Sequence, residues 1–383
     1  MHILIFSTDD HLYPAGGAEN AMGEITKRIP DATFDLVCAR LRKTASYTET
    51  VGNVRIIRVG VGIPRIDGIV LALFGHIIAL RLHAQKPYDA VWSIMASYGA
   101  FAAVRVQRRT RIPFLLTLQE GDPIPDILHR VRFVRAQFNA IFKTADAVQA
   151  ISHYLKRWAE SMGARQVRVV PNGVDVQAFT ATLTAPLHTE TRASFGFQKD
   201  AFILITSSRL EKKNGVGDII EALPLLPPTV VLVICGSGSL QQTLMRRVEE
   251  LGIQTRVRFM GMVPMALLPQ YLHAADAFIR PSLSEGLGNA FLEAMAARLP
   301  TIGTPVGGIP DFLEEGKTGF LCEPSNPHSV AEAVLRAQSL SNADRLRILD
   351  TASEVVRTRY DWDDIAREMH TMFTSLLHAR TRS

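Results

Sequence analysis

Short apolar runs alternate with longer amphipathic stretches along this chain. The first half has apolar runs of strand length at residues 2–8, 34–40, 54–60, 89–95, 113–118, 146–152 and 167–170, and the second half has them at residues 201–208, 229–236, 257–263, 276–282 and 299–304. Apolar runs separated by helical segments are typical of a parallel sheet that helices cover on both faces. The pattern therefore predicts a doubly wound α/β fold.

The alternation is interrupted between residues 172 and 200, where the sequence is polar and irregular and contains Pro186. A chain of 383 residues is also longer than one hydrophobic core usually holds. We predict two domains, residues 1–175 and 201–360, joined by a linker at 176–200. The amphipathic tail at about 361–383, with Trp362 as its anchor, is expected to pack back on the first domain.

The central feature of the second half is the segment 282–310, SLSEGLGNAFLEAMAARLPTIGTPVGGIP. Glu285 and Glu293 bracket a glycine-bearing loop, and we expect a helix to start near Asn289. The amides and the dipole at such a helix start favour an anionic group. The segment therefore predicts a binding site for a phosphate ester.

A basic loop, SRLEKKNG, follows the first strand of the second domain and contains Arg209, Lys212 and Lys213. In parallel sheets, ligands bind beyond the carboxyl ends of the strands. A guanidinium with a nearby ammonium suits a diphosphate at that place. The alternative is a solvated run of charges, which the position after a strand disfavours.

Other polar and glycine residues also follow predicted strands. A pair of adjacent glycines lets backbone approach a ligand, although a plain turn explains it too. The candidates in the first domain are Gly16, Gly17, Gln119, Glu120 and Asp122. In the second domain, Gly236 and Gly238 resemble a dinucleotide fingerprint, but Gln241 replaces the third glycine and no P-loop motif is present, so a nicotinamide dehydrogenase and a P-loop kinase are disfavoured.

Charge and cysteine usage indicate partners and compartment. Residues 1–170 contain 22 Lys+Arg and 14 Asp+Glu, so the net charge of +5 comes from the first half. This surplus predicts an anionic partner such as a membrane surface, whereas no nucleic-acid signature accompanies it. The three cysteines lack metal-ligand spacing and the chain starts with a strand-like run, so we expect a cytoplasmic protein.

Two segments bear on a membrane. Residues 127–143 alternate basic and apolar side chains, which fits either a basic amphipathic helix on an anionic membrane or a sheet-covering helix with solvated arginines. Residues 66–83 are nearly long enough to span a bilayer, but Asp67, His76 and Arg81 interrupt them. We expect a buried or surface-docked helix there.

These segments together resemble one family. GGAE near the start, VVPNGVD, SRLEKKNG, CGSGS and SEGLGNAFLEAMAARLP with TPVGGIPD look like the retaining glycosyltransferases of family 4, the group 1 enzymes. The resemblance covers nearly the whole chain. It implies the GT-B fold, in which two Rossmann-like domains face a deep interdomain cleft.

The resemblance also implies roles for single residues. Arg209 and Lys213 would hold the donor diphosphate, with Lys212 as the alternative to Lys213. Glu293 would bind the ribose hydroxyls, and Glu285 the transferred sugar near the reacting centre. The remaining donor-site residues would be the loop residues Gly286, Leu287, Gly288 and Asn289, the base-pocket residues Gly236, Gly238, Met262 and Val263, and the paired glycines Gly16 and Gly17.

The chain departs from the family pattern where many members carry a histidine in the acceptor-side domain. Gln119, Glu120 and Asp122 stand in that region instead, while His129 lies further on in a predicted helix. A glutamine can hydrogen-bond a sugar hydroxyl, and a carboxylate can accept a proton from the acceptor. These three residues are therefore the catalytic candidates of the first domain, beside Glu285.

The expected function is transfer of a sugar from a UDP-, GDP- or ADP-linked donor to a glycan or lipid-linked acceptor hydroxyl. No Asp-x-Asp motif follows a strand, so we expect neither a metal ion nor a cofactor. The enzyme would act in cell-surface polysaccharide, lipopolysaccharide or glycolipid biosynthesis, in the cytoplasm or peripherally on the inner face of the cell membrane. The alternatives are a nucleotide-sugar epimerase of GT-B-like fold and a non-catalytic nucleotide-sugar-binding protein.

Overall fold

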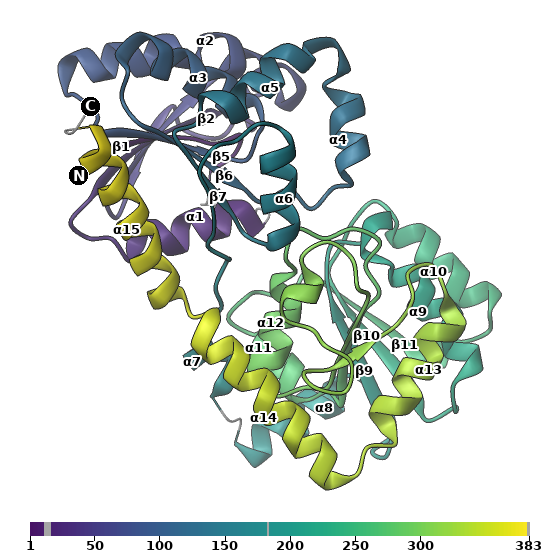
Figure 1. Cartoon of the computed structure of the whole chain (residues 1–383). Helices are drawn as coiled ribbons and strands as arrows, with labels where there is room; N and C mark the ends of the chain where they lie inside the picture. Colours follow the sequence, from purple (N-terminus) through teal and green to yellow (C-terminus); the bar gives the residue numbers. More distant parts are fainter. Residues whose placement is uncertain (11–16, 182–183, 381–383) are drawn as a thin grey trace. The chain divides into compact units, whose positions relative to one another are not determined.

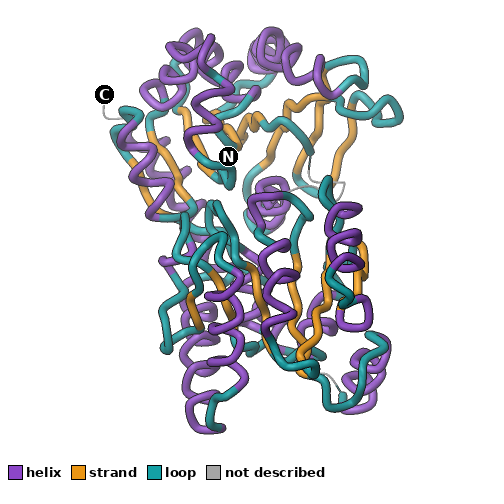
Figure 2. Tube along the Cα trace, turned by 90° about the vertical axis from the view of Figure 1, so that its right-hand side faces the viewer, coloured by secondary structure: helices purple, strands orange, loops and turns teal. Residues whose placement is uncertain are grey.

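The chain forms two α/β units in the computed structural model, which describes residues 1–10, 17–181 and 184–380. Unit 1 comprises Met1–Gly173 together with the C-terminal segment from Trp362, and unit 2 comprises Val174–Asp361. Figure 2 shows the strands of each unit flanked by helices. The predicted α/β class with two parallel sheets is confirmed.

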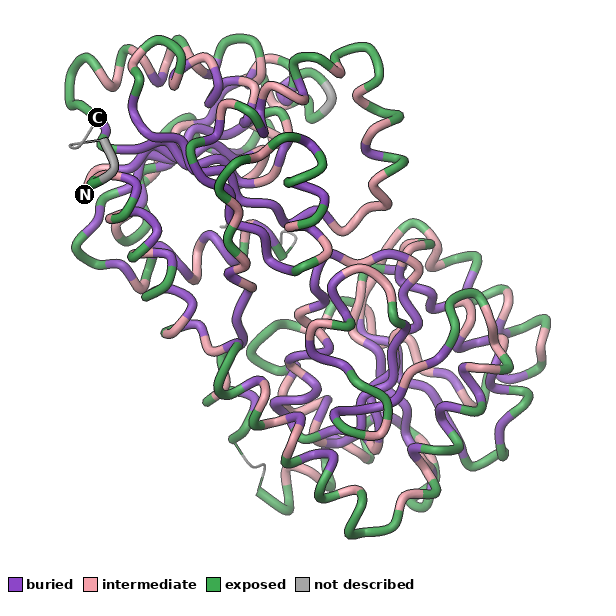
Figure 3. Tube along the Cα trace, viewed as in Figure 1, coloured by how far each residue is buried: buried purple, intermediate pink, exposed green. Residues whose placement is uncertain are grey.

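Unit 1 contains an eight-stranded sheet in the order β3-β4-β2-β1-β5-β6-β7-β8. Only the pairing of β3 with β4 is antiparallel among these strands. Strands β5, β6 and β7 are buried along their whole length, which explains their continuous apolar sequence; Figure 3 shows this buried centre. The strands are β1 (His2–Phe6), β2 (Thr33–Ala39), β3 (Thr48–Val51), β4 (Val54–Val59), β5 (Ala90–Ile94), β6 (Phe114–Leu118), β7 (Ala147–Ala150) and β8 (Val167–Val169).

Helices α2, α3 and α5 lie on one face of this sheet, and α1 and α15 lie on the other (Figure 1). The basic segment 127–143 is not one helix, because a 3-10 turn, η1, separates α4 from α5. The helical elements of unit 1 are α1 (Gly17–Lys27), α2 (Pro64–Gln85), α3 (Tyr98–Thr110), α4 (Ile124–Arg130), η1 (Arg132–Val134), α5 (Arg135–Thr144), α6 (His153–Ser161) and α15 (Trp362–Arg380).

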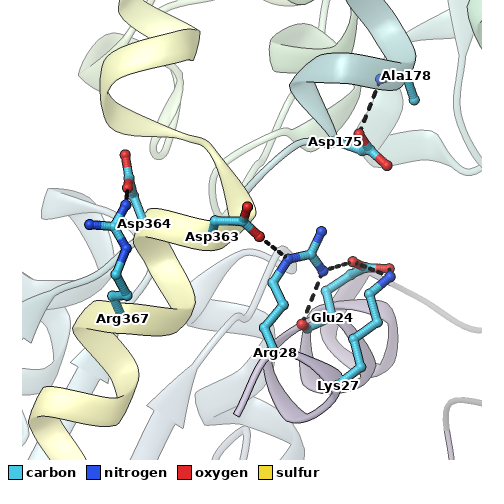
Figure 4. Close-up of polar contacts among 8 residues, drawn as sticks. All are labelled: Glu24, Lys27, Arg28, Asp175, Ala178, Asp363, Asp364 and Arg367. Atoms are coloured by element: carbon cyan, nitrogen blue, oxygen red, sulfur yellow. Dashed lines mark hydrogen bonds and ion pairs between the residues drawn. The ribbon is translucent and has the colours of Figure 1, made fainter. Parts of the chain in front are cut away.

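The C-terminal helix α15 completes the core of unit 1. Phe373 is fully buried and packs edge-on against Trp92, with 5.3 Å between the ring centroids. Arg28, which directly follows α1, donates from Nε to Asp363 Oδ1 at 2.7 Å and from Nη1 to Glu24 of α1 (Figure 4). An apolar stripe and a surface ion pair thus hold α15 against α1.

Unit 2 contains a six-stranded, all-parallel sheet in the order β11-β10-β9-β12-β13-β14. Its strands are β9 (Phe202–Ser207), β10 (Val230–Cys235), β11 (Val257–Gly261), β12 (Ala277–Arg280), β13 (Thr301–Gly303) and β14 (Phe320–Leu321). Its helical elements are α7 (Val176–Thr180), α8 (Ala185–Ser194), η2 (Lys212–Asn214), α9 (Val216–Ala222), η3 (Leu223–Leu225), α10 (Gln241–Glu250), η4 (Gln254–Arg256), α11 (Leu268–His273), α12 (Asn289–Ala296), η5 (Ile309–Asp311), α13 (Pro327–Gln338) and α14 (Asn342–Arg359).

The segment 176–200, which we expected to be a linker, instead forms α7 and α8 of unit 2. His273 Nε2 lies 2.9 Å from the carbonyl oxygen of Phe179, and Arg192 pairs with Asp276 at 2.9 Å. Phe179 and Phe195 are both buried. The prediction of a linker was wrong because only one or two side chains attach each short helix to unit 2. These side chains lie in a polar sequence that has no regular apolar pattern.

We expect Phe373→Ala to lower the free energy of unfolding of unit 1 by about 3–5 kcal/mol, the usual cost of truncating a buried phenylalanine. Urea unfolding followed by tryptophan fluorescence would measure it. Asp363→Ala is the matched control on the same helix: its carboxylate is 76% exposed, so its loss should cost less than about 1 kcal/mol. Equal effects of the two substitutions would contradict a core role for α15.

Candidate functional site

The loops after five parallel strands of unit 2 meet at one edge of its sheet. Parallel strands place their carboxyl ends together, and backbone hydrogen bonds join these loops to one another. These bonds run from Leu210 N to Ser237 O at 2.9 Å, from Gly236 N to Gly261 O at 2.7 Å, from Leu283 N to Lys213 O at 2.7 Å and from Gly308 N to Glu285 O at 3.3 Å. The residues predicted in four separate motifs therefore share one surface of unit 2.

The basic loop after β9 is fixed in place. Glu211 accepts hydrogen bonds from Ser239 N at 3.0 Å and Ser239 Oγ at 2.7 Å. These hydrogen bonds hold the pKa of Glu211 below its usual value, and the positive charges of Arg209 and Lys213 lower it further. Arg209 and Lys212 are exposed, whereas Lys213 is partly buried and its carbonyl binds the loop that carries Glu285. Lys213 thus belongs to the common surface more closely than Lys212 does.

Glu285 forms an ion pair with Arg280, the last residue of β12. The guanidinium donates from Nη2 to Glu285 Oε2, from Nη2 to Asn214 Oδ1 at 3.3 Å and from Nε to Ser282 Oγ at 3.2 Å. Both charged side chains are mostly buried, with 11% and 14% exposed. Arg280 was not predicted as a site residue because it ends an apolar run, in which its charge was the available signal.

Helix α12 starts at Asn289, as predicted, and Gly288 precedes it as the N-cap. Gly288 has φ of 104°, and a Cβ there would lie 2.7 Å from a ring carbon of Phe291. Glycine is required because other residues rarely adopt this conformation and because there is no space. The first amides of an α-helix have no acceptor one turn earlier in the helix, which makes them available to an anionic group, although Phe291 N here donates to Gly288 O at 3.0 Å.

Glu293 lies in the second turn of α12 and is partly buried. Burial raises the pKa of its carboxyl group to about 7, and the positive charge of Arg280 opposes the increase. Within the described ranges its carboxyl group makes no hydrogen bond or ion pair with another side chain. A hydroxyl-bearing ligand would supply the donors that this carboxylate lacks.

The remaining donor-site candidates of unit 2 border the same edge. A Cβ on Gly236 would lie 1.9 Å from Ser208 O, and one on Gly238 would lie 2.5 Å from Leu210 O. Both glycines therefore allow the loops after β9 and β10 to pack closely. Met262 is 60% exposed and Val263 is partly exposed, directly after β11. Gly286 and Leu287 are buried in the loop before α12.

In unit 1, the loop after β6 carries a buried polar cluster. Glu120 is 5% exposed. Its Oε1 accepts a hydrogen bond from Ala96 N at 2.8 Å. Its Oε2 has no hydrogen-bond partner among the described residues. Burial raises the pKa of Glu120 to about 7, against the effect of backbone hydrogen bonds. Asn172 Nδ2 donates to Gln119 Oε1 at 2.9 Å, which leaves Gln119 Nε2 unpaired in the described part of the chain.

The other predicted residues of unit 1 are placed differently. Asp122 pairs with Arg130 at 2.7 Å and is 40% exposed, whereas Gln119 is hydrogen-bonded to Asn172 and Glu120 to the amide of Ala96. Asn172 was not singled out from the sequence, although it lies in the VVPNG segment. Gly17 is the first residue of α1, and Gly16 lies outside the described residues.

Among the described side chains, no three His, Cys, Asp or Glu residues are grouped as metal ligands.

Two sequence-family profiles match this chain. The profile of glycosyl transferases group 1 matches residues 188–352, and that of glycosyltransferase family 4 matches residues 15–178. Between them they include both polar clusters described above.

Three relatives illustrate the range of similarity. The GDP-mannose-dependent alpha-(1-6)-phosphatidylinositol monomannoside mannosyltransferase of Mycobacterium tuberculosis is 31% identical over 302 residues, which are 76% of either chain. A putative teichuronic acid biosynthesis glycosyltransferase of Bacillus subtilis is 27% identical over 75% of this chain and 71% of that protein. An uncharacterised glycosyltransferase of Methanocaldococcus jannaschii is 33% identical over 205 residues, about half of either chain.

Solved structures agree with the fold over nearly the whole length. A sucrose-phosphate synthase from Thermosynechococcus elongatus superposes with a TM-score of 0.87 at 21% identity, covering 99% of both chains. An Anabaena protein crystallised with UDP and glucose gives 0.79 at 20% identity and covers 98% of this chain and all of that one. The prediction of the GT-B fold is confirmed.

We expect Arg280→Ala to destabilise unit 2 by about 3–5 kcal/mol, because the mostly buried Glu285 carboxylate would lose its counter-charge. The double variant Arg280→Ala with Glu285→Ala should recover much of that loss in urea unfolding. Arg298→Ala is the matched control, since its pair with Asp350 is 44% and 64% exposed and should contribute less than about 1 kcal/mol. An Arg280 variant no less stable than the Arg298 variant would contradict the role of this ion pair.

Proposed function

This chain belongs to the group 1 glycosyltransferases of glycosyltransferase family 4, and we propose that it transfers a sugar from a nucleotide-diphosphate sugar to an acceptor hydroxyl with retention of configuration. One observation carries the proposal. A cationic loop, the start of a helix and two carboxylates meet at one edge of the unit 2 sheet. This combination suits a ligand with a diphosphate between two hydroxyl-bearing groups.

The donor diphosphate binds to Arg209, to Lys213 and to the amides of Gly288 and Asn289 in this proposal. A departing nucleoside diphosphate gains negative charge as the glycosidic bond breaks. Cationic groups and helix-start amides stabilise that charge more in the transition state than in the bound substrate. The backbone link from Lys213 to the Glu285 loop favours Lys213 over Lys212 for this role.

The two glutamates bind hydroxyl groups on either side of the diphosphate. Glu293 accepts hydrogen bonds from the ribose hydroxyls, since its carboxyl group pairs with no other side chain among the described residues. Glu285 accepts a hydrogen bond from a hydroxyl of the transferred sugar. Arg280 balances the charge of Glu285 and fixes the orientation of its carboxylate. The nucleobase lies by Gly236, Met262 and Val263.

Glu120 takes the proton of the acceptor hydroxyl. Its buried Oε2 has no partner in the described part of the chain and is a suitable acceptor, and a pKa of about 7 is near the optimum for a general base at neutral pH. Gln119, held by Asn172, has a free amide donor for a sugar hydroxyl. This arrangement would replace the histidine that many family members carry.

The substrate classes are proposed from the chemistry and from the names of relatives. The mycobacterial relative uses GDP-mannose and a phosphatidylinositol mannoside, and the Bacillus relative is assigned to teichuronic acid biosynthesis. We propose a UDP-, GDP- or ADP-linked donor and a glycan or lipid-linked acceptor, in cell-surface polysaccharide or glycolipid biosynthesis in the cytoplasm. The cationic site makes a metal ion unnecessary for neutralising the diphosphate.

Two other activities would use the same donor site. An epimerase would release a free epimerised sugar from the donor without any acceptor, and a non-catalytic protein would bind the donor without consuming it. Incubating the purified chain with donor alone, and then with donor and acceptor, separates these activities from transfer. Transfer that depends on the acceptor is the expected result.

We expect Arg209→Ala and Glu293→Ala each to weaken nucleotide-sugar binding about tenfold to a hundredfold, because each removes a charge-assisted hydrogen bond. Isothermal titration calorimetry with UDP-, GDP- and ADP-sugars would measure the change. Lys213→Ala should weaken binding more than Lys212→Ala, and Lys317→Ala, an exposed lysine on another loop, should leave it unchanged. Unchanged affinity in both the Arg209 and Glu293 variants would refute the donor site.

We expect Glu120→Gln to reduce kcat at least a hundredfold while donor affinity stays within about twofold. The wild-type kcat/KM should rise with pH through about 7, because the folded-state pKa of Glu120 is raised from 4.5 and the protonated form cannot act as a base. The residual rate of the variant should lack this rise. Full activity of Glu120→Gln would remove Glu120 from the mechanism.

A further inference from the structure

The outward side of α2 is an exposed apolar stripe. Its members recur every three or four residues, so they lie on one face of the helix. Figure 3 shows α2 at the surface of unit 1. The stripe consists of Ile66, Ile69, Leu73, Phe74 and Ile77, which are 48%, 51%, 47%, 52% and 38% exposed. Scattered exposed apolar residues are ordinary, but five on one helix face mark an interaction surface.

The inward side of α2 is firmly packed in unit 1. A Cβ on Gly68 would lie 2.9 Å from the ring of Tyr98, and one on Gly75 would lie 3.5 Å from Ala102 Cβ. Asp67 is fully buried and accepts hydrogen bonds from the amides of Val61, Gly62 and Ile63. In the described part of the chain, α2 is the one helix long and apolar enough to cross a bilayer. Its close packing against α3 and the sheet shows that it is a layer of unit 1.

The two faces of the unit 1 sheet differ in charge. The segments on the α2 side, residues 64–85, 98–111 and 124–144, contain ten Lys+Arg and two Asp+Glu, a net charge of +8. The segments on the other face, residues 17–28 and 362–380, contain four Lys+Arg and five Asp+Glu, a net charge of −1. The basic surplus of the first half of the chain is therefore concentrated on the side that carries the apolar stripe.

Arginines border the stripe directly. Arg105 of α3 donates from Nη1 to the carbonyl oxygen of Ala72 on α2. Burial, and then the positive charges of Arg105 and Arg109, lower the pKa of His76 on α2. Arg81 is exposed one turn beyond Ile77. In the same helical layer, η1 presents Phe133, 84% exposed, with the Arg132 guanidinium 4.4 Å from its ring centroid.

We propose that the outer face of α2, with the arginines of α3 beside it, docks unit 1 flat on an anionic lipid bilayer. Apolar side chains would enter the boundary between headgroups and acyl chains, and the arginines would bind lipid phosphates. A second copy of the chain is a poor occupant, because a two-fold contact through this face would bring like charges together. The anionic membrane expected from the basic surplus would thus contact α2 first, rather than residues 127–143.

The full-length chain can be tested by cosedimentation with vesicles. We expect binding to phosphatidylcholine vesicles that contain one third phosphatidylglycerol, weakening with added salt, and little binding to pure phosphatidylcholine. Replacing Ile69, Leu73 and Phe74 together by serine should weaken binding at least tenfold. The control replaces Leu335 and Leu346, which are 40% and 56% exposed in unit 2, and should bind as the wild type does.

A second set of variants tests the charges. Replacing Arg108, Arg109 and Arg111 by glutamine should weaken binding about fivefold for each arginine that lies near the surface. Replacing Arg357, an exposed arginine on α14, should have no effect. Circular dichroism and donor titration should remain as in the wild type for all variants, so that failure of docking and failure of the proposed transfer reaction are read separately.

Three outcomes would overturn the proposal. The first is no binding to anionic vesicles, and the second is equal binding to neutral ones. The third is wild-type vesicle binding by the triple serine variant. Light scattering adds one more decisive result: a wild-type dimer that the serine variant converts to monomer would make this face a contact between copies of the chain.

Discussion

Parallel strand pairing is the constraint on which the rest of this structure depends. Strands that all run in one direction place all their carboxyl ends at one edge, and the connecting helices must cover both faces. The loops after β9 and β12 are distant in sequence, yet Leu283 N and Lys213 O meet there at 2.7 Å. The basic loop after β9 and the loop after β12 that carries Glu285 thus form one surface, although each motif is short.

The sequence predicted most of what this constraint controls. The apolar runs gave the strands, and Gly288 gave the start of α12 at Asn289, because only glycine fits the left-handed N-cap there. The sequence did not predict Arg280 as the ion-pair partner of Glu285, because that pairing depends on which strand end lies beside the Glu285 loop in the folded sheet. Asn172 was missed for the same reason, and α7 and α8 were missed because their attachment rests on single side chains such as Phe179 and Arg192.

The chain separates two kinds of polar chemistry. In unit 2, Arg280 compensates Glu285, so this carboxylate is fixed and suited to binding. In unit 1, Glu120 accepts a hydrogen bond from the Ala96 amide and from no cation among the described residues, and burial raises its pKa to about 7. A neighbouring positive charge thereby suits Glu285 to binding, and burial away from water suits Glu120 to proton transfer.

The return of α15 to unit 1 has a consequence for folding during synthesis. The core around Trp92 stays incomplete until Phe373 is made, and all 188 residues of Val174–Asp361 lie between the two parts of unit 1. At roughly 5–20 residues per second, the ribosome needs about 10–40 s to make that insert. Unit 2 can therefore fold before unit 1 is complete, because the sheet of unit 1 lacks its last covering helix until α15 has been made.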